Sequence, residues 1–241
     1  MTHKRLSQET LKLIACLTML LDHIGAIVVM GMFSRNPSRE LLDLYETLRL
    51  IGRIAFPIYC FLLAEGSFYT HNPRRYGIRL AVCALVSELP YDLALWGGLN
   101  WGHQNVMITL LLAFGALETM KKYPNMLWKL LAAAPFAILA SLARADYGAE
   151  GVLLVVLFAL TRDMPSRLIA QFFGMWFLFS PGHAMMLNWF GGFSVTIQEW
   201  AVLALIPIAL YSGRKLTDSR LVQWGFYLFY PLHLLILWFL R

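Results

Sequence analysis

The sequence predicts an all-α fold, a polytopic bundle of about nine transmembrane helices. Of its 241 residues 59% are hydrophobic and only 14% are charged, and the mean hydropathy is +0.61. Soluble domains average about half apolar and about a quarter charged residues, so this composition excludes an ordinary soluble protein. Apolar runs recur along the whole chain, and basic residues gather in every second connection between them. We therefore expect a single membrane-embedded domain over residues 1–241.

The expected spans are the apolar runs that can cross about 30 Å of hydrocarbon. The first run follows Lys4 and Arg5 and lacks a small-residue cleavage site, so we expect it to be retained as a span. The runs at 105–120 and 147–161 are short for this thickness. The full set is 11–32, 49–69, 79–97, 105–120, 127–143, 147–161, 166–180, 197–211 and 221–240.

The basic residues alternate between the two sides of the expected bundle. Fourteen of them lie at the N-terminus and in the connections at 70–79, 121–129, 162–167 and 212–220. The other connections and the C-terminus hold only Arg35, Arg39, Arg49, Arg144 and Arg241. The positive-inside rule then places the N-terminus in the cytoplasm and the C-terminus outside. Because topology accounts for the net charge of +6, the charge does not indicate nucleic-acid binding.

Known motifs of soluble catalysis and of metal binding are absent from the sequence. The six histidines show no His-x-x-His or i,i+4 spacing and no neighbouring cysteine, so we expect no metal site. There is no phosphate-binding glycine loop and no Gly-x-Ser-x-Gly elbow. Cys16, Cys60 and Cys83 all lie in apolar segments, where we expect small buried side chains and not a disulfide framework.

Asp22 and His23 interrupt the first apolar run, and ionisable residues inside membrane helices usually serve a function. His23 lies about twelve residues, roughly 18 Å, above the start of the run, toward the outer side. Neighbouring helical side chains point about 100° apart, so we expect Asp22 to orient against another helix. For His23 a catalytic or ligand role stands beside a satisfied core histidine.

More polar residues are expected at the same depth, where they would form an outward-facing chamber. Arg49 and Arg53 share one helix face, as do Glu88 and Asp92. These two cations and two carboxylates predict either an ion-pair lattice between helices or a catalytic or substrate site. The remaining outer polar residues are His103, Gln104, Asn105, Arg144, Asp146, Glu150, His183, Glu199 and His233.

On the predicted inner side, Glu65 and Gly66 end a span close to Arg74, Arg75 and Arg79. Such a cluster is often only a topogenic loop. Guanidinium groups also bind phosphate oxygens in pairs, so a site for a cytoplasmic nucleotide-like donor is the alternative.

These motifs resemble the TraX family, membrane proteins named for N-terminal acetylation of conjugative pilin. The matching stretches run in order along nearly the whole chain. They are Leu11 to Ile14, Leu21 to Gly25, Arg49 to Pro57, Leu62 to Gly66, Ser87 to Leu93, Asn105 to Leu112, Asp146 to Gly151 and Tyr227 to Leu234. TraX proteins in turn look like compact relatives of the transmembrane acyltransferases, in which a histidine of an early helix is the base. His23 holds that position, whereas the arginine that precedes the histidine has no counterpart, and Lys12 stands one residue nearer.

The resemblance implies transfer of an acetyl group from cytoplasmic acetyl-CoA to an outer amine or hydroxyl, such as a pilin N-terminus. His23 would take the proton or carry the acetyl group, and Asp22 and Asp92 would fix it. Arg53 or Asn105 would steady the oxyanion. The donor would bind Arg74, Arg75, Arg79 and Glu65, and the acceptor would bind Arg49, Glu88, His103, Asp146 and His233. The resemblance also implies a multi-pass protein of the bacterial inner membrane, in contact with lipid. The alternative is a non-enzymatic transporter or a scaffold for pilus or conjugation assembly, although no internal repeat supports a transporter.

Overall fold

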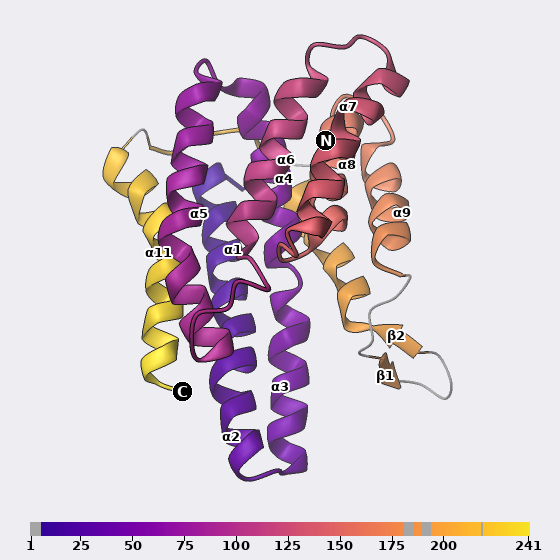
Figure 1. The fold of residues 1–241 in the computed structure, drawn as a ribbon. Helices are drawn as coiled ribbons and strands as arrows, with labels where there is room; N and C mark the ends of the chain where they lie inside the picture. Colours follow the sequence, from indigo (N-terminus) through magenta and orange to yellow (C-terminus); the bar gives the residue numbers. More distant parts are fainter. Residues whose placement is uncertain (1–5, 181–185, 189–193, 218) are drawn as a thin grey trace.

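Helices run side by side along one axis in this protein (Figure 1). The structure is a computed structural model and describes residues 6–180, 186–188, 194–217 and 219–241. The first half comprises α1 (Gln8–His23), the π-helix η1 (Ile24–Val29), α2 (Met30–Arg35), α3 (Arg39–Gly52), α4 (Ala55–Tyr69), α5 (Pro73–Trp96) and α6 (Val106–Met120). The second half comprises α7 (Met126–Leu142), α8 (Gly148–Thr161), α9 (Arg167–Phe179), β1 (Met186–Asn188), β2 (Ser194–Thr196), the 3₁₀ helix η2 (Ile197–Ala204), α10 (Leu205–Ala209) and α11 (Arg220–Phe239).

The predicted helical bundle is confirmed, with one small addition: β1 and β2 pair antiparallel beside η2. Among the described residues three continuous helical segments are long and apolar enough to cross a membrane. They are Gln8–Arg35, Arg39–Tyr69 and Leu221–Phe239. Five shorter apolar helices of 10–17 residues accompany them. These segments indicate a membrane protein, as the composition predicted.

The expected break between the first two spans, residues 33–48, is mostly helical, so the predicted helix ends are wrong there. The first helix continues to Arg35, and α3 begins at Arg39. Ser38 caps α3 by accepting a hydrogen bond from the backbone N–H of Leu41 at 3.2 Å. An i,i+4 ion pair between Arg39 and Asp43, 3.0 Å long, supports the first turn. Figure 1 shows α2 and the start of α3 extending beyond the other helices as a hairpin.

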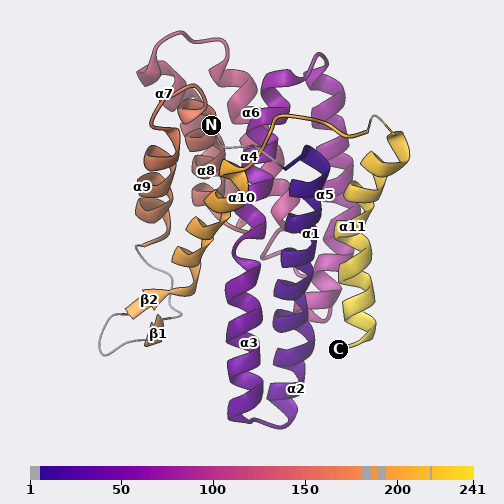
Figure 2. The same cartoon turned by 180° about the vertical axis from the view of Figure 1, so that it is seen from behind.

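Polar N-cap residues begin two helices, α1 and α5, at the end of the bundle where α1 starts. Ser7 Oγ accepts from the N–H of Thr10 at 3.1 Å and starts α1. Asn72 Oδ1 accepts from Arg75 N at 2.9 Å, and Pro73 occupies the first position of α5. The connections at 70–72, 121–125, 162–166 and 212–217 all lie at this end (Figures 1 and 2). The hairpin of α2 and α3 and the C-terminus lie toward the other end, so the two charge classes of connection separate in space.

The helix α4 lies at the centre of the core. It is apolar around its whole circumference, and most of its residues, from Ala55 to Ser67, are buried. It packs against α1, α6 and α8. The Phe61 and Phe158 rings meet edge to face with centroids 5.7 Å apart. On another side α1 also contacts α11, and this places the middle of α1 between α3, α4 and α11.

Candidate functional site

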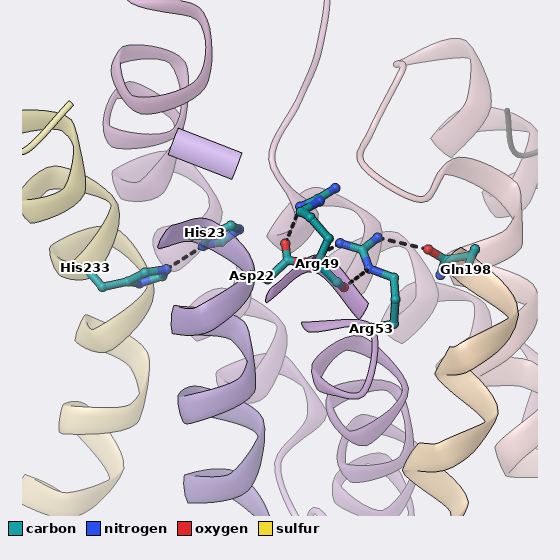
Figure 3. A network of polar contacts seen from close by, with 6 residues as sticks. All are labelled: Asp22, His23, Arg49, Arg53, Gln198 and His233. Carbon is teal, nitrogen blue, oxygen red and sulfur yellow. Dashed lines mark hydrogen bonds and ion pairs between the residues drawn. The ribbon is translucent and has the colours of Figure 1, made fainter. Parts of the chain in front are cut away.

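Asp22 holds a cluster of polar contacts between α1, α3 and η2, which we call the ion-pair cluster: Asp22, Arg49, Arg53 and Gln198 (Figure 3). Arg49 Nη1 donates to Asp22 Oδ2 at 2.5 Å, and Arg53 Nη2 donates to Asp22 Oδ1. Arg53 Nη1 also donates to Gln198 Oε1 at 2.9 Å. Only about a tenth of the Asp22 and Arg53 side chains is exposed, so this is a buried network. Each arginine pairs directly with the one carboxylate of Asp22, which gives every buried charge a partner.

Local geometry makes room for this cluster. Arg49 and Arg53 are four residues apart at the end of α3 and so share a face. Gly52 lies between them, and a Cβ at this position would overlap the Asp22 carboxylate. The absent side chain at Gly52 therefore lets α1 approach α3 closely enough for both ion pairs.

His23 points the other way, to α11, as expected for the neighbour of Asp22 on a helix. Its Nδ1 lies 2.6 Å from Nε2 of His233, and the two nearly parallel rings lie end to end with centroids 4.9 Å apart (Figure 3). The Nδ1 of His233 lies 2.7 Å from the carbonyl oxygen of Phe229. We call His23 and His233 the histidine pair. The π-helix η1 begins at the residue after His23, and π-turns often accompany functional sites.

A cavity of about 500 Å³ runs from His23 to one end of the bundle, and His233 does not line it. Lys12, Met19 and His23 line it from a single face of α1. Lys12 and His23 are eleven residues apart, which at 1.5 Å per residue is roughly 16 Å along the helix. The middle of the wall is largely apolar and includes Leu62 and Leu63 of α4. His23 is thus far along the cavity from Lys12.

Three cations line the entrance at the end of the bundle that the charge pattern predicts to be cytoplasmic: Lys12, Arg79 and Lys215. We call this group the inner mouth. Lys12 Nζ lies 5.3 Å from the centre of the Phe226 ring, and Arg79 lies 5.4 Å from the centre of the Tyr76 ring. Cations on aromatic walls suit an anionic ligand group such as a phosphate.

Around His23 the cavity is bordered by tyrosines and by one further acid. Asp146 and Tyr147 reach it from the connection before α8, while Tyr91 comes from α5 and Tyr230 from α11. The ring of Tyr147 stacks on Phe56 with centroids 3.7 Å apart. The backbone N–H of Asp146 donates to the carbonyl of Gln104 at 2.9 Å and so fixes this connection. The structure therefore brings Asp146 to the cavity, as the sequence predicted, and adds phenol groups that the sequence analysis did not single out.

Comparison with known proteins agrees with this architecture. The family model described as TraX protein matches residues 7–241. The chain belongs to the TraX family. A curated relative, "Probable fimbrial assembly protein FimC, serogroup H1" of Dichelobacter nodosus, is 27% identical over 239 residues, covering 94% of this chain and 92% of the relative. No solved structure matches the chain.

In this TraX family member, the predicted partners of the arginines differ from those observed. Asp22, and not Glu88 or Asp92, pairs with Arg49 and Arg53. Glu88 instead receives hydrogen bonds from the backbone N–H and the side-chain amide of Asn105. This exchange follows from the fold, because α1 packs directly against α3.

Asn105 has a structural position at the start of α6. Its Oδ1 accepts from Met107 N at 2.9 Å as the N-cap, and its Nδ2 donates to the carbonyl of Ala84 at 2.9 Å. Asn105 is fully buried and does not line the cavity. Its role at an oxyanion stays a prediction without geometric support.

Three other predicted site residues lie off the cavity wall, as does His233. Asp92 Oδ2 accepts from the backbone N–H of Asn100 at 2.9 Å. The ring of His103 stacks on Trp96, 4.9 Å away. Glu88 likewise does not line the cavity. Within the described chain, one buried oxygen each of Glu88 and Asp92 has no hydrogen-bond partner. Direct roles for these three residues stay predictions, and His183 lies outside the described residues.

The predicted donor-binding residues divide in the TraX fold. Arg79 lines the inner mouth, whereas Arg74 and Arg75 are exposed and off the cavity wall. Glu65 accepts a hydrogen bond from Arg162 Nε at 2.7 Å and is also off the wall. Lys215 was missed because it is more than two hundred residues away from Lys12 in the chain. Among the described residues no group of three His, Cys, Asp or Glu side chains could hold a metal ion.

Proposed function

We propose that this TraX family member is a membrane acyltransferase that moves an acetyl group from acetyl-CoA to an amine or hydroxyl acceptor. One observation carries the proposal: a single cavity is lined by three cations at one end and by His23 roughly 16 Å away. A donor that fits this cavity has an anionic group at the three cations and a reactive group near His23. CoA thioesters have this form, with phosphates at the head and the thioester at the end of a long arm.

The inner mouth suits the phosphates of such a donor. Arg79, Lys12 and Lys215 supply positive charge where the cavity opens, and charge-assisted contacts to phosphate are strong. The largely apolar wall beyond, with Met19 and Leu62, suits the uncharged arm. In this arrangement the thioester would reach the level of His23.

His23 then acts as the general base. Its Nε2 takes a proton from the acceptor while the acceptor nitrogen or oxygen attacks the thioester carbonyl carbon. The carbon–sulfur bond breaks as the tetrahedral intermediate collapses, and the thiolate of CoA leaves with that proton. Arg49, whose side chain is 25% exposed, supplies positive charge toward the developing oxyanion. The acid and phenols of Asp146, Tyr91 and Tyr230 border the space left for the acceptor.

The proposal also includes a location. The inner mouth faces the cytoplasm of a bacterial cell in a multi-pass inner-membrane protein, and the acceptor arrives from the outer side. This orientation follows from the positive-inside rule applied to the connections at 70–79, 121–129 and 212–220.

A second candidate function is a scaffold in fimbrial assembly, which the name of the Dichelobacter nodosus relative favours. Acyl transfer and a role in fimbrial assembly are compatible if the acceptor is a fimbrial or pilus subunit with a free amine. Only the scaffold function would hold if the chain is needed for assembly but transfers no acetyl group.

The deciding experiment uses purified protein in lipid nanodiscs with radiolabelled acetyl-CoA and candidate amines. We expect His23→Ala and His23→Gln to fold and to lose transfer, because neither can take up a proton. Activity retained by His23→Gln would refute the general-base role. No transfer by the unmodified protein to any amine or hydroxyl tested, with fimbriation still dependent on the chain, would favour the scaffold.

The donor site has a matched pair of variants. Replacing Lys12, Arg79 and Lys215 together with Gln should weaken acetyl-CoA binding by at least about tenfold, since each phosphate contact is charge-assisted. Replacing Arg74 and Arg75, which are off the cavity wall, should leave binding unchanged. Equal effects of both sets would show that the cavity entrance is not the donor site.

A further inference from the structure

We propose that His233 is a positioning residue that holds His23 in one tautomer, with hydrogen on Nδ1 and the Nε2 lone pair exposed to the cavity. This inference rests on the proposed function, in which Nε2 of His23 is the base. It assigns to His233 a task other than binding the acceptor. The assignment follows from two hydrogen bonds that share the imidazole of His233.

The first bond settles which nitrogen of His233 carries hydrogen. Its Nδ1 lies 2.7 Å from the carbonyl oxygen of Phe229, and a carbonyl only accepts, so Nδ1 of His233 must donate. A neutral imidazole has a single N–H, so Nε2 of His233 is left with a lone pair.

The surroundings of His233 favour this neutral form. Its side chain is buried, with 4% of the residue exposed, and its ring is nearly parallel to that of Phe229 with centroids 4.7 Å apart. Asp22, the carboxylate next to His23 in the sequence, is turned to Arg49 and Arg53. Burial without an anionic partner disfavours an imidazolium.

The second bond transmits this choice to His23. Its Nδ1 lies 2.6 Å from the Nε2 lone pair of His233, so Nδ1 of His23 must be the donor. His23 then has its own lone pair at Nε2, on the side of the ring away from α11. Since the ring lines the cavity and no described residue hydrogen-bonds to this Nε2, the lone pair is available to an acceptor molecule. The backbone of α11 thus fixes the protonation pattern of a residue on α1.

Two variants separate positioning from packing. His233→Phe keeps a ring of similar size and removes both nitrogens, whereas His233→Gln places an amide oxygen where Nε2 accepts from His23. We expect His233→Phe to lower kcat by about ten- to a hundredfold, with KM for acetyl-CoA unchanged because the inner mouth is untouched. His233→Gln should recover most of the loss. If His233 were purely structural, the transfer activity of both variants would change only in proportion to their folded yield.

The direct measurement is ¹⁵N NMR of histidine-labelled protein in nanodiscs, with His23→Gln identifying the resonances of His23. We expect the protonated nitrogen of His23 to be Nδ1 in the unmodified protein and in His233→Gln, and a mixture of tautomers in His233→Phe. Hydrogen on Nε2 of His23 in the unmodified protein would overturn the proposal, as would an inactive His233→Gln or a fully active His233→Phe. If no acyl transfer is found at all, the proposed function fails, but the spectrum still decides the tautomer.

Discussion

Loss of the Asp22 carboxylate should be among the most damaging single changes in this chain. Asp22→Ala leaves Arg53 buried without its anionic partner and leaves Arg49 partly so; their side chains are 10% and 25% exposed. Removing one partner of a buried ion pair costs about 3–5 kcal/mol, since the other charge stays desolvated. At about 2–4 °C per kcal/mol for a chain of this size, the midpoint of thermal unfolding should fall by roughly 6–20 °C.

The chain supplies its own control in the pair of Arg39 and Asp43, whose side chains are 82% and 56% exposed. Asp43→Ala should cost about 0–1 kcal/mol and shift the midpoint by only a few degrees. Unfolding in a defined detergent, followed by tryptophan fluorescence, compares the two variants. Adding Arg53→Met to Asp22→Ala should recover part of the loss, because it removes a stranded charge. Equal midpoints for Asp22→Ala and Asp43→Ala would refute the reasoning.

Two further predictions test the surroundings of the site, and a third tests the membrane topology. Gly52→Ala should destabilise the protein by about 1–3 kcal/mol, because the added Cβ displaces the carboxylate of the ion-pair cluster. Gly225→Ala is the control: Gly225 has open space around it, so this variant should be neutral or slightly stabilising in the same thermal unfolding assay. Asn105→Ala should lower the stability by about 1–2 kcal/mol through the lost helix cap. If this variant lost acetyl transfer while its melting temperature stayed unchanged, the predicted oxyanion role of Asn105 would be supported instead. A reporter fused after Arg241 should be active outside the cytoplasm and one near Arg74 inside it; a C-terminus in the cytoplasm would reverse the proposed sides.

Much of the bundle was predictable because apolar run length and helical periodicity are local properties. The same local geometry predicted that Asp22 and His23 face different helices, and the structure sends them to α3 and α11. The helix at 39–52 was missed because its charged first turns resemble a loop. Ser38 as a cap, followed by Leu41, Leu44 and Leu48 at helical spacing, was the signal available.

Pairing between helices was not predictable in the same way. Nothing local distinguishes Asp22 from Glu88 as the partner of Arg53, since either carboxylate satisfies a guanidinium. The choice depends on which helices touch, and that depends on side-chain fit such as the space at Gly52. For the same reason Lys215 joins Lys12 at the inner mouth without any sequence motif that links them.

The two networks around α1 act together as a constraint on its rotation. Asp22 ties one face of the helix to α3, and the next residue, His23, ties a face about 100° away to His233 on α11. Turning α1 to improve either contact would lengthen the other, so the orientation is set by both. Lys12 belongs to the same rigid helix, and its distance from His23 is therefore fixed as well. If a donor binds at Lys12 as proposed, the helix α1 would hold its head group at a fixed distance from the proposed base, His23.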